Sequence, residues 1–161
     1  MKIASCIGLS LLLWGANALA AAAPAEGQKA VLVTGASTGI GRKVTERLAA
    51  DGHFVYAGAR KEKDLAELDA IENVQAIRLD VTKPAEIAAA VETITKAGRG
   101  LYGLVNNAGV AVTGPFMDTK EEDFDFVMDV NTYGPFRVTK GFAPLIVASK
   151  GRITTISSIS G

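Results

Sequence analysis

The chain of 161 residues carries 17 lysines and arginines against 17 aspartates and glutamates, so its formal net charge at pH 7 is zero. Because no basic run marks a nucleic-acid-binding face, we expect no nucleic-acid partner, and we expect no metal site. Hydrophobic residues make up 48% of the chain and glycine contributes 17 residues, a composition that suits one domain with a buried parallel sheet.

The first 20 residues predict a signal peptide. Residues 1–2 give a short basic start, residues 3–23 contain no charged side chain, and the small-x-small triplet at 18–20 is typical of a cleavage site. We therefore expect cleavage after Ala20 and export to the periplasm or out of the cell. The apolar run is also long enough to span a membrane, so an uncleaved N-terminal membrane anchor is the alternative.

After a flexible lead-in at 21–28, strand-like runs alternate with helical periodicity through one domain, residues 29–161. Strands are expected at 30–34, 53–57, 74–79, 101–105 and 152–157. Helices are expected from Ile40 to about Asp51, from Lys63 to Ile71, from Pro84 onward, and from about Thr119 to about Ser149. We expect the last of these to begin with a capping box of Thr119 and Glu122 and to bend near residues 134–135. Such alternation predicts an α/β fold with a doubly wound parallel sheet, whose ligand lies at the carboxyl ends of the strands.

The segment 30–41 (AVLVTGASTGIG) joins an apolar strand to a helix through a glycine turn. We expect Gly35 to permit a tight turn, Gly39 to let the backbone reach phosphates, and Gly41 to let the helix pack closely on the strand. The unpaired N–H groups and the dipole of the helix would stabilise a diphosphate there. The P-loop ending Gly-Lys-Ser/Thr is absent from this segment, which disfavours a nucleoside triphosphate. Taken alone, the turn is also compatible with a purely structural connection.

Five pieces of the sequence together resemble the short-chain dehydrogenase/reductase family, in the family's order. They are TGASTGIG at 34–41, LDVT at 79–82, NNAG at 106–109, Asn131, and GRITTISSISG at 151–161. The resemblance covers residues 29–161 and implies a Rossmann-like sheet with the family's strand order 3-2-1-4-5-6-7. We expect this chain to hold strands 1 to 5 of the seven, an incomplete sheet in which the fifth strand is an exposed edge. It also implies an oxidoreductase that interconverts a small-molecule alcohol and a carbonyl compound by hydride transfer.

The resemblance implies roles for individual residues. Contacts with the phosphates and ribose of the cofactor are implied for Gly35, Ser37, Gly39, Ile40 and Gly41. Asp80 would accept a hydrogen bond from the adenine amino group, Val81 would supply a backbone contact, and Asn107, Ala108 and Gly109 would line the path beside the cofactor.

Two catalytic residues are implied as well. Asn131 would hold a water molecule in a proton relay, and Ser158 would hydrogen-bond the substrate carbonyl or hydroxyl. Alternative interpretations remain open: Asp80 could only cap the following helix, and Asn131 could only satisfy backbone groups at a helix kink.

The end of the second strand predicts NADP rather than NAD. An acid about 20 residues beyond the glycines would bind the ribose hydroxyls of NAD, but residues 57–61 read Ala-Gly-Ala-Arg-Lys. A guanidinium pairs bidentately with a 2′-phosphate, so we expect Arg60 as the main contact, helped by Lys61 and Arg42. Glu62, one position further, is the acid that would favour NAD.

The proton donor of the family is a tyrosine four residues before a lysine, on the helix after the fifth strand. No tyrosine of this chain (Tyr56, Tyr102, Tyr133) has a lysine four residues later. We therefore expect a chain truncated before that motif, inactive alone, from an enzyme whose full-length form is a homo-oligomer. A non-catalytic nucleotide-binding module is the alternative.

Overall fold

The computed structural model describes residues 27–158. The expected signal peptide or anchor, residues 1–20, and most of the expected lead-in lie outside the described residues, so export and anchoring stay predictions. Across residues 27–158, no helix combines the length and the apolar character that crossing a bilayer requires.

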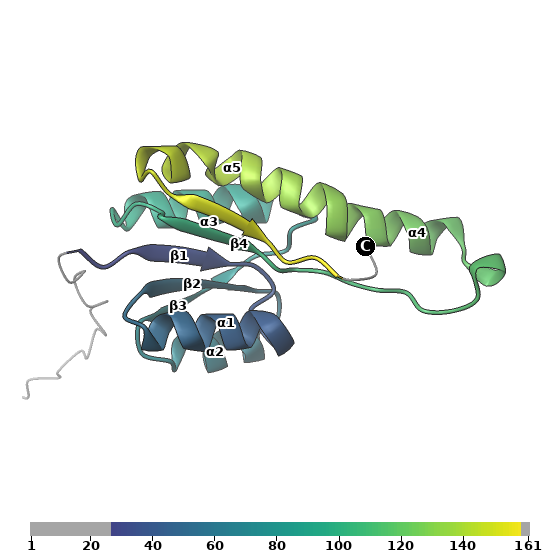
Figure 1. The fold of residues 1–161 in the computed structure, drawn as a ribbon, viewed down its shortest axis with the longest axis horizontal. Helices are drawn as coiled ribbons and strands as arrows, with labels where there is room; N and C mark the ends of the chain where they lie inside the picture. Colours follow the sequence, from purple (N-terminus) through teal and green to yellow (C-terminus); the bar gives the residue numbers. More distant parts are fainter. Residues whose placement is uncertain (1–26, 159–161) are drawn as a thin grey trace, which may run out of the picture.

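The strands of the described residues form one parallel sheet with the order β3-β2-β1-β4-β5 (Figure 1). They are β1 (Ala30–Val33), β2 (Phe54–Ala59), β3 (Val74–Arg78), β4 (Gly103–Asn106) and β5 (Arg152–Thr155). The chain first moves outward from β1 to β3 and then returns to add β4 and β5 on the other side. The expected doubly wound fold and strand order are therefore confirmed, and the order reverses between β1 and β4, where such sheets bind ligands.

Helices cover both faces of the sheet. Figure 1 shows α1 (Gly39–Ala50) and α2 (Glu62–Asp69) on one face, and α3 (Pro84–Lys96) and α5 (Gly134–Ala148) on the other. The helix α4 (Glu121–Met128) continues the line of α5 beyond the ends of the strands. Pro84 occupies the first turn of α3, as expected, where its missing N–H leaves no hydrogen bond unmade.

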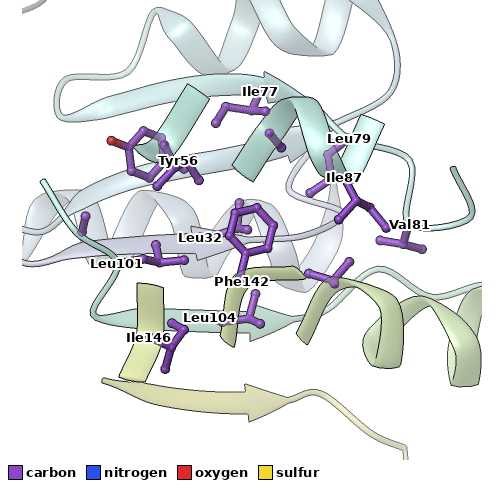
Figure 2. Close-up of a cluster of buried hydrophobic side chains, with 14 of the residues drawn as sticks. Leu32, Tyr56, Ile77, Leu79, Val81, Ile87, Leu101, Leu104, Phe142 and Ile146 are labelled. Atoms are coloured by element: carbon purple, nitrogen blue, oxygen red, sulfur yellow. The ribbon is translucent and has the colours of Figure 1, made fainter. Parts of the chain in front are cut away.

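Alternation along the strands divides the apolar side chains between two cores. On one face, Leu32 of β1 belongs to a buried cluster with Ile87 of α3 and Phe142 of α5 (Figure 2). On the other face, Val33 belongs to a second cluster that includes Leu68 of α2. Both faces of β1 are buried, which accounts for its apolar sequence throughout. The buried strand therefore sets where the following glycine turn lies.

The expected long helix after residue 119 is divided. A π-helical turn (Asp129–Tyr133) separates α4 from α5, just before the position at which the bend was expected. The expected capping box is wrong: Lys120 is the N-cap residue of α4 and no side-chain cap hydrogen bond forms. A short 3-10 turn (Phe116–Asp118) precedes it, and the Thr119 hydroxyl donates to the Pro115 carbonyl at 3.4 Å instead.

Candidate functional site

A cleft of about 340 Å³ lies at the carboxyl edge of the sheet. Most of its lining comes from the carboxyl ends of β1, β2, β3 and β4 and the segments that follow them, which parallel pairing brings to the same edge. Val130 of the π-helical turn completes it. Most of the residues predicted to bind the cofactor are brought together here: Gly35, Ser37, Ile40, Arg60, Asp80, Val81, Asn107, Ala108 and Gly109. Gly39, Gly41 and Lys61 are not part of the lining.

Glycine occupies each of the three positions of the turn for a different physical reason. Gly35 has a φ of 64°, and a Cβ there would lie 2.8 Å from Ala108 Cα, so both conformation and space require glycine. Gly39 also has a positive φ, 57°, but its missing side chain faces open space at the start of α1. A Cβ on Gly41 would overlap the Gly35 carbonyl oxygen and the Asn107 side chain. Gly41 therefore packs α1 against the turn and Asn107, rather than against the strand as expected.

Thr34 and Asn107 tie the turn to the end of β4. The Thr34 hydroxyl accepts hydrogen bonds from the backbone N–H groups of Asn107 and Ala108, each at 3.0 Å. In return, Asn107 Nδ2 donates to the Thr34 carbonyl at 3.0 Å and to the Gly35 carbonyl at 3.1 Å. The role of Thr34 was missed by the sequence reasoning, although the residue stands inside the quoted glycine motif. Asn107 braces the turn and also lines the cleft.

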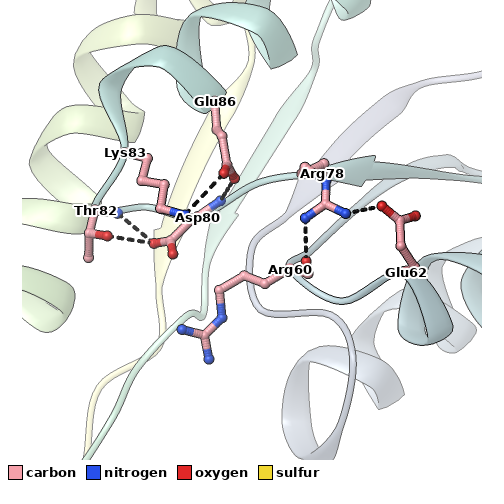
Figure 3. Close-up of polar contacts among 7 residues, drawn as sticks. All are labelled: Arg60, Glu62, Arg78, Asp80, Thr82, Lys83 and Glu86. Atoms are coloured by element: carbon pink, nitrogen blue, oxygen red, sulfur yellow. Dashed lines mark hydrogen bonds and ion pairs between the residues drawn. The ribbon is translucent and has the colours of Figure 1, made fainter.

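Asp80 follows β3 and is held by Thr82. Asp80 Oδ1 accepts from the Thr82 hydroxyl at 2.7 Å and from the Thr82 backbone N–H at 3.0 Å (Figure 3). Burial raises the pKa of Asp80, but these hydrogen bonds and the positive charges of Arg60 and Lys83 outweigh it, so the pKa lies below its ordinary value. The carboxylate is therefore ionised at neutral pH and can accept further hydrogen bonds.

Asp80 is not a helix cap. The N-cap residue of α3 is Lys83, which makes no side-chain cap hydrogen bond. Glu86 of α3 instead reaches back, its carboxylate accepting the Asp80 backbone N–H at 2.8 Å. The capping interpretation of Asp80 therefore does not describe its contacts, and its side chain lines the cleft.

The cations beside β2 differ in their surroundings. Arg60 lines the cleft, and in the part of the chain that the structure describes no carboxylate lies within 4 Å of its guanidinium. Arg42 pairs with Glu46 at 2.8 Å on α1 and does not line the cleft, so it is not placed as the expected helper. Lys61 is the exposed N-cap residue of α2.

The two predicted catalytic residues lie at the border of the cleft or beyond it. Asn131 sits in the π-helical turn, where its Oδ1 accepts from the Val110 N–H at 2.9 Å and its Nδ2 donates to the Val110 carbonyl at 2.8 Å. Asn131 thus satisfies backbone groups, as one interpretation of the sequence proposed, and its part in a proton relay stays a prediction. Ser158 is exposed three residues beyond β5 and does not line the cleft.

A glycine turn, a bracing asparagine and a strand-end aspartate thus meet at the edge where the sheet order reverses. The family model described as short chain dehydrogenase matches residues 29–161. The chain belongs to the short-chain dehydrogenase family. Recognition from the five sequence pieces is therefore confirmed.

Other short-chain dehydrogenases match over most of this chain. Mitochondrial D-beta-hydroxybutyrate dehydrogenase from Bos taurus is 38% identical over 157 residues, which cover 91% of this chain and 46% of the relative. The crystal structure of a short-chain dehydrogenase from Streptomyces avermitilis superposes with a TM-score of 0.77 at 33% identity, covering 84% of this chain and 51% of the other. The chain thus spans about half the length of these short-chain dehydrogenases.

A further structural neighbour was solved with a bound ligand. It is an alcohol dehydrogenase from Thermococcus sibiricus complexed with 5-hydroxy-NADP. It superposes with a TM-score of 0.71 at 29% identity, and the match covers 80% of this chain and 57% of the neighbour.

Proposed function

We propose that this chain binds NADP in the cleft and belongs to an oxidoreductase that, in full-length form, interconverts a small-molecule alcohol and a carbonyl compound. The observation that carries the cofactor choice is the Arg60 guanidinium, which lines the cleft and has no carboxylate within 4 Å among the described residues. Family membership supports an NAD(P)-dependent oxidoreductase. The names of the relatives, as hydroxybutyrate and alcohol dehydrogenases, support the alcohol class.

The residues of the cleft fit this cofactor. Open space around Gly39 leaves the first turn of α1 accessible to a diphosphate, whose charge the free N–H groups and the helix dipole stabilise. Asp80 has one carboxylate oxygen, Oδ2, that accepts no hydrogen bond within the described residues, and it can accept from an adenine amino group. Arg60 would pair with the 2′-phosphate. The cofactor would accept the hydride from the alcohol or, in its reduced form, donate it to the carbonyl compound, and Ser158 would hydrogen-bond the substrate oxygen.

Titration of the chain with NADP and with NAD, for the native sequence and for Arg60→Ala, tests this proposal. We expect Arg60→Ala to weaken NADP binding by about tenfold to hundredfold, the scale of a lost charge-assisted hydrogen bond, and to change NAD binding by less than about twofold. Lys61→Ala is the matched control, because it removes a neighbouring cation outside the cleft and should change the ratio little. An unchanged ratio of NADP to NAD affinity in Arg60→Ala would contradict the choice of NADP.

A second candidate function is a nucleotide-binding module without turnover. It is favoured by the lining of the cleft, which comes from the glycine turn and the ends of β2 to β4 and does not include Ser158. Incubation of the 161-residue chain with NADP and simple alcohols, or with NADPH and simple carbonyl compounds, gives one test. Turnover above background would exclude the module, whereas both candidates predict binding without turnover, because the chain alone is expected to be inactive. The intact mass of the protein from its native source then separates them: a mass far above 16.7 kDa favours the oxidoreductase, and a mass at or below 16.7 kDa favours the module.

A further inference from the structure

Arg78, at the end of β3, holds both ends of the short segment that follows β2. Its Nη1 donates to the Arg60 carbonyl oxygen at 2.6 Å, and its Nη2 pairs with the Glu62 carboxylate (Figure 3). Parallel pairing makes this possible, because Arg78 lies opposite Ala59 in the register of β3 and β2. One guanidinium therefore fixes the backbone of Arg60 and the side chain of Glu62 at once.

The short segment after β2 contains two charged side chains that would favour different ligands. Glu62 is the first residue of α2 and stands two positions beyond Arg60, the cation that lines the cleft. A carboxylate that turned toward the cleft would accept hydrogen bonds from free ribose hydroxyls and would repel a 2′-phosphate. A guanidinium in the same place would do the reverse.

The structure separates these two groups. Figure 3 shows the Arg60 guanidinium extending away from the Arg78–Glu62 pair, on the side where Asp80 lies, while Glu62 stays on the far side of Arg78. In the part of the chain that is described, the carboxylate that Arg78 contacts is that of Glu62, and no other cation pairs with Glu62. Arg78 thus pairs with the Glu62 carboxylate and leaves the Arg60 guanidinium available to a ligand in the cleft.

We propose that Arg78 is a positioning residue that selects for a 2′-phosphate by holding the Glu62 carboxylate away from the cleft. The inference rests on the proposed NADP binding and deepens it. Arg78 itself contacts no ligand in this proposal, and its effect on selectivity passes through Glu62.

The test is a double-mutant cycle on the 161-residue chain, with dissociation constants for NADP and NAD measured by titration calorimetry. Arg78→Met should lower the ratio of NADP to NAD affinity by about tenfold, the scale of one charged hydrogen bond gained or lost by the ligand. Adding Glu62→Gln to Arg78→Met should restore the ratio to within about threefold of the native value, because no carboxylate is then released. Glu62→Gln alone should change the ratio by less than about twofold, since Arg78 already holds the Glu62 carboxylate away from the cleft in the native chain.

Two further variants separate selectivity from a general loss of structure. Arg47→Met removes an arginine from a similar exposed pair, Arg47–Asp51 at 2.9 Å on α1, and should leave both affinities unchanged. Arg78→Lys keeps the charge but loses the planar fork that reaches both groups, so we expect an intermediate ratio.

Three outcomes would overturn the proposal about Arg78. The first is an unchanged ratio in Arg78→Met. The second is a lowered ratio that Glu62→Gln fails to restore, which would place the effect of Arg78 in its hydrogen bond to the Arg60 carbonyl or in a direct contact with the phosphate. The third is a large effect of Glu62→Gln alone. Each of these leaves nucleotide binding intact. Failure of the native chain to bind either nucleotide would instead overturn the proposed function, and this inference with it.

Discussion

At the residue scale, one buried hydroxyl, that of Thr34, connects the glycine turn to the segment that follows β4. Thr34 is buried directly after β1, and its Oγ1 accepts hydrogen bonds from the N–H groups of Asn107 and Ala108. We expect Thr34→Val, which keeps the shape and removes the acceptor, to lower the free energy of unfolding by about 2 kcal/mol, because two partly buried N–H groups lose their partner. Urea denaturation followed by circular dichroism measures this change.

The control for this prediction keeps the hydroxyl. Thr34→Ser removes one methyl group and should cost about 1 kcal/mol, the usual effect of a small buried deletion. If Thr34→Ser destabilised the chain as much as Thr34→Val, the methyl group rather than the hydroxyl would be what matters at this position.

At the element scale, the π-helical turn between α4 and α5 has a definite use. It places Asn131 where both ends of its amide reach the backbone of Val110, a residue that lines the cleft. We expect Asn131→Ala to lower the free energy of unfolding by about 1 to 2 kcal/mol and to speed amide hydrogen exchange at Val110, because two backbone groups lose their partners. Hydrogen exchange followed by mass spectrometry or NMR measures the local effect.

Thr132 offers a matched control on the same turn. Its hydroxyl has only a weak 3.8 Å contact with Met128 Sδ. Thr132→Ala should therefore leave exchange at Val110 close to its native rate. Equal acceleration in both variants would mean that the turn as a whole, and not the Asn131 amide, holds the segment after β4.

The elements of this fold could be predicted from the sequence where a repeating pattern encodes them. The buried runs of β1 to β4 and the apolar stripes of α1 and α3 have the periods of strand and helix, so their existence and order follow. The π-helical turn at 129–133 inserts one residue into a helix, and no period signals that insertion. The Thr119 capping box failed because a 3-10 turn captured the residue that would have capped.

The candidate site shows the same division. Gly35 could be predicted because a backbone of positive φ demands glycine, and its motif is local. The Arg78–Glu62 pair joins residues 16 positions apart, and Thr34 meets groups more than 70 positions away. Contacts of this kind depend on strand register, which the sequence pattern indicates only after the sheet order is known.

At the scale of the whole molecule, the two borders of the sheet differ. In β3 four of the five residues are buried or half-buried, whereas all four residues of β5 are exposed. Within residues 27–158, β5 pairs with β4 on one side and with no strand on the other. An exposed β-branched strand with an unpaired edge is a template for pairing with another chain.

We expect the 161-residue chain to associate through β5, and a charge on that strand to oppose it. Thr154→Lys places a lysine on the exposed strand and should raise the concentration at which association begins by about tenfold, because a charge would have to be buried in the new pair. Thr113→Lys adds the same charge at an exposed position between β4 and α4 and should leave association unchanged. Sedimentation velocity over a concentration series measures the effect. Equal shifts in the two variants would show that net charge, and not the edge of β5, controls association, since both variants carry the same added charge.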